Sequence, residues 1–208
     1  MILFSGCSFT YGDELSDPTK ERFSSYFDSY NIGQCGICND AIVRNTISEI
    51  ESNPKKYDTV VVQFTLHTRT EVSLQDGYLP ITPQNIKYAT RKVKQWKFAK
   101  VIYKNELWTT HIGKENINKN IFFMQTFLRM KRLKYIFLSI DRRNPRNWTD
   151  YTDSCWKNMI DSPITNIHDI IGYPSKNPEY FYKPTGQLAD HPNSLGHQVI
   201  SNAIKERL

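Results

Sequence analysis

A β-branched run, Asp58–Phe64, restricts this chain to a small set of folds. Such runs are typical of central strands in a parallel sheet, because helices cover both faces of the strand and leave no polar side. Lys134–Ile140 repeats the pattern, and Ile2–Phe4 begins the chain with a shorter version. Asp40–Ser52 carries apolar residues at helical spacing and stops at Asn53-Pro54. Strands that alternate with helices predict an α/β protein with a parallel sheet wrapped on both faces.

The first strand leads into a serine turn that glycines flank, Gly6-Cys7-Ser8-Phe9-Thr10-Tyr11-Gly12. We expect the strand to end at Ser8, which places the hydroxyl at the carboxyl end of the sheet and the N–H near a helix N-terminus. Both placements suit acyl transfer, because free N–H groups and the helix dipole stabilise an oxyanion. The alternative is an ordinary strand-to-helix turn with Ser8 as the N-cap, a position that serine often occupies.

A histidine segment near the far end of the chain, Asp190-His191-Pro192-Asn193-Ser194-Leu195-Gly196-His197, is the second candidate for chemistry. Ser194 begins a predicted amphipathic helix, so His191 lies in the loop just before it. His197 lies inside the start of that helix, and we interpret it as structural. Active sites of open parallel sheets lie at the carboxyl ends of the strands, so the two segments are predicted to meet there.

Together, the N-terminal Gly-x-Ser-Phe-Thr-x-Gly turn and the C-terminal His-Pro-Asn-x-x-Gly-His segment resemble the SGNH (GDSL-like) hydrolase superfamily. The resemblance implies a flavodoxin-like, three-layer α/β/α fold with a central parallel sheet of order 2-1-3-4-5, in a single domain over residues 1–208. It also implies that Ser8 is the nucleophile of a serine hydrolase and that His191 is its general base. Cys7 departs from the better-known members, which carry Asp there.

The resemblance also implies donors for an oxyanion. Gly36, in the loop at 31–39, takes the place of the family glycine that offers an N–H, and Asn39 lies where many relatives carry Asn. The next block of the family holds a further Asn after the third strand. Here that strand leads into Thr65-Leu66-His67 with no Asn. Thr65 and Asn39 are therefore the two candidates for the missing donor.

The acid of a catalytic triad has three alternatives in this sequence. The usual family position, three residues before the histidine, is Leu188, so the nearest carboxylate, Asp190, takes the predicted role. Because neighbouring side chains in an extended loop point to opposite sides, Asp190 reaches the ring of His191 only if the loop turns sharply. Asp141, which follows the run at 134–140, is the second alternative. A Ser-His dyad oriented by a backbone carbonyl is the third.

The formal net charge of +6 is concentrated in one segment. Lys87–Lys134 holds thirteen Lys or Arg against two acids, and much of it is predicted to be helical, as a basic insertion at about 85–132. Such a segment is either a solvated helical face or a surface for an anionic partner. The sequence has no recognised nucleic-acid-binding motif, which argues against a nucleic-acid partner. The apolar stripe of the segment is predicted to contain Ile121, Met124, Phe127, Leu128 and Met130.

The remaining features exclude several classes of protein. Four cysteines are too few for a disulfide scaffold at this length, and Cys35-Gly36-Ile37-Cys38 has no second pair to complete a zinc site. We therefore expect neither a metal nor another cofactor. We find no signal peptide and no apolar run of the ~20 residues that cross a bilayer. These observations predict a protein without membrane contact, either cytoplasmic or associated with a virion.

The expected activity is hydrolysis of an acyl ester through an acyl-enzyme on Ser8. Abundant Tyr and Trp with polar loops favour a small-molecule or carbohydrate ester, such as an O-acetyl sugar, over a long acyl chain. The competing hypothesis is a weak or inactive relative that serves as a binding or virion-associated structural module and holds an anionic partner on the basic segment. Departures at Cys7, Thr65 and Leu188 favour that hypothesis. The composition resembles members encoded by bacteriophages or marine bacteria.

Overall fold

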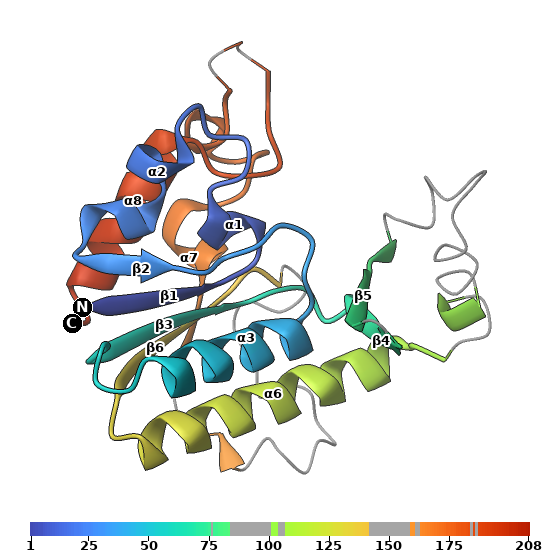
Figure 1. The fold of residues 1–208 in the computed structure, drawn as a ribbon. Coiled ribbons are helices and arrows are strands. Elements are labelled where there is room, and N and C mark those ends of the chain that lie inside the picture. Colours follow the sequence, from blue (N-terminus) through green and yellow to red (C-terminus); the bar gives the residue numbers. More distant parts are fainter. Residues whose placement is uncertain are drawn as a thin grey trace.

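The computed structural model describes residues 1–75, 77–83, 101–103, 107–141, 159–160, 163–183, 185 and 187–208. All the strands of its main sheet are parallel: β1 (Ile2–Gly6), β2 (Ser29–Asn31), β3 (Thr59–Phe64), β6 (Lys134–Ser139) and β7 (Ile164–Asn166). Their order is β2-β1-β3-β6-β7 (Figure 1). Counted along the chain, these strands have the predicted order 2-1-3-4-5.

Helices cover both faces of this sheet, as Figure 1 shows. One face carries α3 (Asn39–Ser52) and α6 (Thr110–Met130). The other face carries α1 (Ser8–Tyr11), α2 (Pro18–Glu21), α7 (Ile167–Ile171) and α8 (Ser194–Lys205). Two 3₁₀ turns, Phe23–Tyr26 and Pro178–Tyr180, pack against α8. The protein therefore has the predicted three-layer α/β/α architecture.

The sheet buries one apolar face of each long helix. All residues of β3 are buried, as expected for a central strand. On α6 the fully buried side chains recur at helical spacing, and burial of each stabilises the fold by about 1.5–3 kcal/mol. They are Ile117, Ile121, Met124 and Leu128. Met130, which the periodicity assigns to the same stripe, is 77% exposed, because it is the last residue of the helix, where the chain turns toward β6.

An antiparallel hairpin of β4 (Thr70–Leu74) and β5 (Gly77–Ile81) forms a separate two-stranded sheet that the sequence analysis does not predict. Of the predicted basic insertion, residues 85–100 and 104–106 lie outside the described residues. In its described part, two lysines pair with acids of α3. Lys119 lies 3.5 Å from Asp40, and Lys131 lies 2.7 Å from Glu51. None of the helices in the described part is long and apolar enough to cross a membrane.

The register of the sheet brings the ends of three strands to one edge. Gly6 of β1 lies opposite Gln63 of β3, and the same alignment continues from β3 to β6. The residues that follow these strands therefore leave the sheet at neighbouring points. They include Ser8 after β1, Thr65 after β3 and Asp141 after β6.

His197, which we interpreted as structural, is fully buried in α8. Its Nδ1 accepts a hydrogen bond from the Phe23 N–H at 3.1 Å, and its ring stacks on the Phe23 ring with centroids 5.4 Å apart. Burial, and then the nearby His191, lower the pKa of His197 to about 3. The folded protein thus holds a neutral ring that is charged in the unfolded chain at acidic pH.

We expect His197→Gln to remove part of the acid sensitivity of folding, while the glutamine oxygen still accepts from the Phe23 N–H. Because the pKa of His197 is depressed from 6.5 to about 3 on folding, only the unfolded chain binds this proton between those pH values. The free energy of unfolding should therefore fall as the pH drops below 6.5, by at most about 1.4 kcal/mol per pH unit. Urea unfolding at pH 7.5 and pH 5 should show a smaller loss in His197→Gln than in the wild type. Equal losses would contradict this assignment.

Candidate active site

Ser8 is the first residue of α1, directly after the N-cap Cys7. β1 ends at Gly6, so the strand stops two residues earlier than predicted and the serine stands at the start of the helix. The alternative role of Ser8 as N-cap does not apply, because Cys7 takes that position and no side chain caps the helix. The hydroxyl of Ser8 is thus free to bond elsewhere, although the residue is only 4% exposed.

The hydroxyl of Ser8 bonds to a histidine from the other end of the chain. Nε2 of His191 lies 2.8 Å from Oγ of Ser8, and the His191 ring packs against the Phe9 ring. Because Phe9 follows Ser8 in α1, one helical turn supplies both the hydroxyl and a surface for the imidazole. The two segments singled out in the sequence therefore meet at the carboxyl end of β1.

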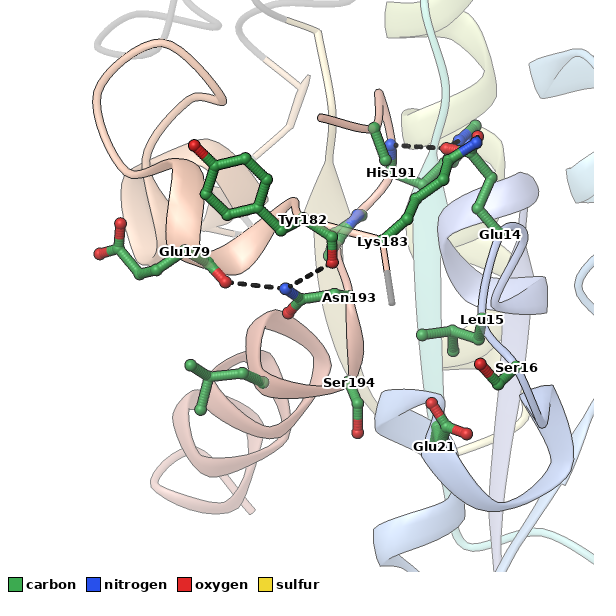
Figure 2. Close-up of a pocket in the computed structure, with 13 residues that line it drawn as sticks. Glu14, Leu15, Ser16, Glu21, Glu179, Tyr182, Lys183, His191, Asn193 and Ser194 are labelled. Carbon is green, nitrogen blue, oxygen red and sulfur yellow. Dashed lines mark hydrogen bonds and ion pairs between the residues drawn. The ribbon is translucent and has the colours of Figure 1, made fainter. Parts of the chain in front are cut away.

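The loop before α8 is fixed by the residues of the Asn-x-x-Gly spacing. Asn193 caps α8 by accepting a hydrogen bond from the Gly196 N–H, and its Nδ2 donates to the carbonyls of Glu179 and Tyr182 (Figure 2). Gly196 permits close packing, because a Cβ there would lie 2.8 Å from the Tyr180 carbonyl oxygen. This part of the motif therefore holds the loop in place and leaves the imidazole to face the serine.

The carboxylate beside His191 belongs to Glu14. Its Oε2 lies 3.0 Å from His191 Nδ1 and accepts a hydrogen bond from the His191 backbone N–H at 3.3 Å. Its Oε1 pairs with Lys183 at 2.5 Å, and Figure 2 shows these three side chains converging. A carboxylate at Nδ1 favours the tautomer protonated there, which leaves the Nε2 lone pair to face the Ser8 hydroxyl.

Glu14 remains ionised despite its partial burial. Burial raises the pKa of the carboxyl, but the hydrogen bonds from Lys183 and His191 together outweigh it, and the net shift of the Glu14 pKa is downward. A carboxylate held in this state stabilises the imidazolium that forms when His191 takes up a proton.

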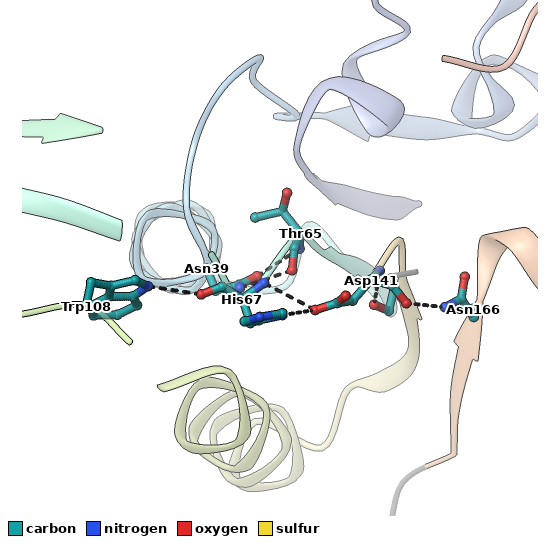
Figure 3. Close-up of polar contacts among 7 residues, drawn as sticks. Asn39, Thr65, His67, Trp108, Asp141 and Asn166 are labelled. Atoms are coloured by element: carbon teal, nitrogen blue, oxygen red, sulfur yellow. Dashed lines mark hydrogen bonds and ion pairs between the residues drawn. The ribbon is translucent and has the colours of Figure 1, made fainter. Parts of the chain in front are cut away.

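The two carboxylates singled out in the sequence lie elsewhere. Asp190 is exposed to solvent, in keeping with the rule that neighbouring side chains of an extended loop point apart. Asp141 is buried and bonds to the ring and the backbone N–H of His67 (Figure 3). Among the described residues, the carboxylate that bonds to His191 is Glu14, so the structure puts Glu14 where the sequence analysis expected Asp190.

The loop that carries Gly36 packs against the serine turn, residues 6–12. Gly33 approaches the turn so closely that a Cβ would lie 2.8 Å from the Tyr11 nitrogen. Gly36 itself has a φ of 77°, which glycine adopts without strain, and open space where a Cβ would stand. Its N–H has no acceptor within the described ranges, and neither has the N–H of Ser8 at the helix start. Two N–H groups without an acceptor among the described residues thus lie on the serine itself and in the loop that packs against the serine turn.

Asn39 and Thr65, the two candidates for a third donor, differ in whether their side chains already have hydrogen-bond partners. The Asn39 carboxamide is engaged with the Thr65 backbone, since Oδ1 accepts from the N–H at 2.8 Å and Nδ2 donates to the carbonyl at 3.2 Å. The hydroxyl of Thr65 is buried and has no hydrogen-bond partner among the described residues. Figure 3 shows this side chain pointing away from His67 and Asp141.

The thiols of the C-x-x-C pair are not activated nucleophiles. Burial raises the pKa of Cys38 to about 12. Burial, followed by the charge of Asp13, raises the pKa of Cys35 to about 11. Because the thiolate is the reactive form, both thiols stay protonated and weakly nucleophilic at neutral pH.

A pocket of about 310 Å³ lies beside His191 and Glu14 (Figure 2). Its walls come from the segment after α1, from the 3₁₀ turn at Pro178–Tyr180 and the residues after it, and from the start of α8. The residues that line it include polar ones with hydroxyl, carboxylate and amine groups and apolar ones such as Leu15, Ala189 and Leu195. Among them are Ser16, Glu179, Tyr182, Lys183 and Ser194.

No family model matches this sequence, and no curated protein matches it. Solved structures share its fold. A protein assigned to the G-D-S-L lipolytic family from Desulfitobacterium hafniense aligns with a TM-score of 0.59 at 10% identity, over 100% of this chain and 98% of that chain. For a GDSL-like lipase from Bacteroides thetaiotaomicron the TM-score is 0.53 at 14% identity, over 99% and 86%. For the psychrotrophic esterase EstA from Pseudoalteromonas it is 0.52 at 11% identity, over 99% and 97%. The chain therefore has the fold of the GDSL-type, or SGNH, hydrolases.

Proposed function

We propose that this protein is a serine esterase that hydrolyses an acyl ester through an acyl-enzyme on Ser8. The observation that carries the proposal is the 2.8 Å hydrogen bond between Ser8 Oγ and His191 Nε2, with Glu14 at Nδ1 of the same ring. A hydroxyl, an imidazole and a carboxylate bonded in this order activate serine on several unrelated folds. The fold shared with GDSL-type hydrolases supports the same proposal.

The reaction would begin with attack of Ser8 Oγ on the ester carbonyl carbon, while His191 Nε2 takes the hydroxyl proton. Glu14 remains ionised and stabilises the imidazolium. When the tetrahedral intermediate collapses, His191 returns the proton to the leaving alcohol. A water molecule, deprotonated by His191, then attacks the acyl-enzyme, and the free carboxylic acid and Ser8 are released.

We assign three donors to the oxyanion: the N–H of Ser8, the N–H of Gly36 and the hydroxyl of Thr65. Thr65 lies two residues after Gln63, as Ser8 lies two residues after Gly6, and these strand ends are opposite each other in register. A buried hydroxyl without a partner carries an energetic cost that an oxyanion would remove.

Asn39, the other candidate, then has a supporting role. Its Nδ2 is already bonded to the Thr65 carbonyl and its Oδ1 accepts from the Thr65 N–H. The carboxamide therefore fixes the backbone from which the Thr65 hydroxyl projects, with one of its two N–H donors and its oxygen engaged in these bonds.

Thr65→Val is expected to lower kcat by about 100-fold, the usual effect of losing one oxyanion donor. Valine keeps the shape of threonine and removes a hydroxyl that has no partner, so the free energy of unfolding should stay the same or rise. Thr46→Val is the matched control, because it removes a buried hydroxyl on α3 that bonds to Ser5 Oγ at 2.7 Å. The control should lose stability and keep its kcat. If Thr65→Val keeps the wild-type kcat, the third donor is another group.

The pocket beside His191 favours a small, hydroxylated leaving group. Its volume of about 310 Å³ is at the lower end of the range for ligand pockets. Ser16, Ser194 and Lys183 are among the residues that line it, and hydroxyl and amine groups bond to alcohols. The substrate class that we propose is therefore a short acyl ester of a polar alcohol, such as an acetylated sugar.

A panel of esters tests both the activity and the substrate class. It consists of p-nitrophenyl acetate, butyrate and octanoate together with a peracetylated hexose. We expect turnover of the acetyl and butyryl esters and of the sugar, a decline at octanoyl, and no turnover by Ser8→Ala. Folded wild-type protein that hydrolyses none of these esters, beside an active control esterase, would argue against the proposal.

A further inference from the structure

A buried carboxamide that the proposed mechanism leaves unassigned lies next to the serine turn. Gln63, on β3, is 1% exposed. Its Oε1 accepts hydrogen bonds from the Cys7 N–H at 3.1 Å, the Cys7 thiol at 3.2 Å and the Thr10 hydroxyl at 3.1 Å. Its Nε2 donates to the Phe64 carbonyl at 2.6 Å. One side chain thus bonds to the residue before Ser8 and to the residue two places after it.

The glycine at position 6 makes room for this arrangement. Gly6 lies opposite Gln63 in the sheet, and a Cβ on Gly6 would stand 2.2 Å from Thr10 Oγ1 and 2.9 Å from the Gln63 side chain. A larger residue would displace either the carboxamide or α1. The first glycine of the Gly-x-Ser turn is therefore matched to the glutamine on the neighbouring strand.

The Cys7 N–H depends on this one acceptor. Within the described residues it bonds to Gln63 Oε1 and to nothing else, and both residues are buried, so water does not replace the carboxamide. Loss of the acceptor would leave a buried donor unsatisfied next to Ser8, a state that favours movement of the turn.

We propose that Gln63 is a positioning residue for the Ser8 nucleophile. The inference rests on the proposed esterase function and adds a side chain that links β3 to the serine turn. A single carboxamide bonds both to the strand that leads to Thr65 and to the serine turn, and so holds the two in a fixed relative position. A displacement of about 1 Å costs about 100-fold in rate, because the reacting atoms no longer meet at the required distance. Removal of the carboxamide would thus slow the reaction without removing any group that contacts the substrate.

Gln63→Met tests this role against a matched control, Gln125→Met. Gln125, on α6, is 2% exposed, and its carboxamide donates to the Met159 carbonyl at 3.0 Å. Both variants lose a buried carboxamide of the same length, so both should have a lower Tm. Only Gln63→Met should lose kcat, by about 100-fold, with little change in KM. Gln63→Glu keeps the acceptor oxygen and, because burial favours the protonated carboxyl, a donor for the Phe64 carbonyl, so it should recover most of that loss.

Amide hydrogen exchange at Cys7, resolved by NMR, gives a second readout that does not depend on activity. The Cys7 amide should exchange faster in Gln63→Met than in the wild type or Gln125→Met, while the amides of β3 stay protected. Gln63→Asn withdraws the carboxamide by one methylene and should act in the same direction, should the methionine variant not fold.

Two outcomes would overturn the inference: a kcat of Gln63→Met equal to that of Gln125→Met, or unchanged exchange at Cys7. If the wild type hydrolyses no ester at all, the esterase proposal fails by itself. The exchange measurement still shows in that case whether Gln63 holds the serine turn.

Discussion

Ser8→Ala is expected to lower kcat for ester hydrolysis by about 10⁵-fold or more, while the protein remains folded. The variant lacks the only atom that can form the acyl-enzyme in the proposed mechanism, and the residual rate would come from binding and from the remaining oxyanion donors. His191→Ala should cause a loss of similar size, because a serine without its base is a weak nucleophile. The double variant should be little worse than either single one, since the two residues act as a unit. Steady-state kinetics with p-nitrophenyl acetate measures all three.

Ser5→Ala is the control for this loss. Ser5 lies on β1, is buried like Ser8, and bonds to Thr46 rather than to a histidine. It should keep the wild-type kcat. If Ser8→Ala and Ser5→Ala have the same activity as the wild type, Ser8 is not the nucleophile.

Glu14→Gln is expected to lower kcat by about 10³- to 10⁴-fold with the fold preserved. Glutamine keeps the size of the side chain but removes the charge that stabilises the His191 imidazolium. It also removes the carboxylate that favours the proton on Nδ1, so the ring can present its N–H to Ser8 in the wrong tautomer. Steady-state kinetics with p-nitrophenyl acetate measures this loss, and thermal unfolding checks that the fold is preserved.

Asp190→Asn is the natural comparison for Glu14→Gln. Asp190 is the carboxylate next to His191 in the sequence, but it is exposed, whereas Glu14 bonds to the ring. The Asp190 variant should stay within a few-fold of the wild type, as is usual for a surface residue. A large loss in Asp190→Asn with a small one in Glu14→Gln would reverse the assignment of the acid.

Much of the fold is predictable from the sequence because its elements carry strong local signals. The apolar run of β3 and the helical periodicity of α3 each indicate one type of structure, and the strand order follows from the resemblance of the two terminal motifs. The β4–β5 hairpin has a weaker signal, an Asp-Gly pair at 76–77, of which Gly77 is the first residue of β5. That pair is a known hairpin turn signal, but the strands around it are partly exposed and lack a clear apolar face.

Ser8 and His191 are predictable because each lies in a sequence motif of its own. Glu14 is not, because 177 positions separate it from His191 and no spacing rule links them. Its side chain reaches the His191 ring because the backbone turns at Gly12 and Glu14, which both have positive φ. The residue types alone do not predict that turn. The choice between Asn39 and Thr65 likewise depends on a tertiary contact, since the Asn39 amide is engaged by the Thr65 backbone.

The most direct test of an activated Ser8 is covalent labelling by a fluorophosphonate, followed by peptide mapping, because it requires no knowledge of the substrate. We predict one adduct, on Ser8, that is absent in Ser8→Ala, strongly reduced in His191→Ala and Glu14→Gln, and retained in Asp190→Asn. Folded wild-type protein that forms no adduct, or forms it on another residue, beside a control hydrolase that is labelled, would contradict the proposed Ser8-His191-Glu14 mechanism.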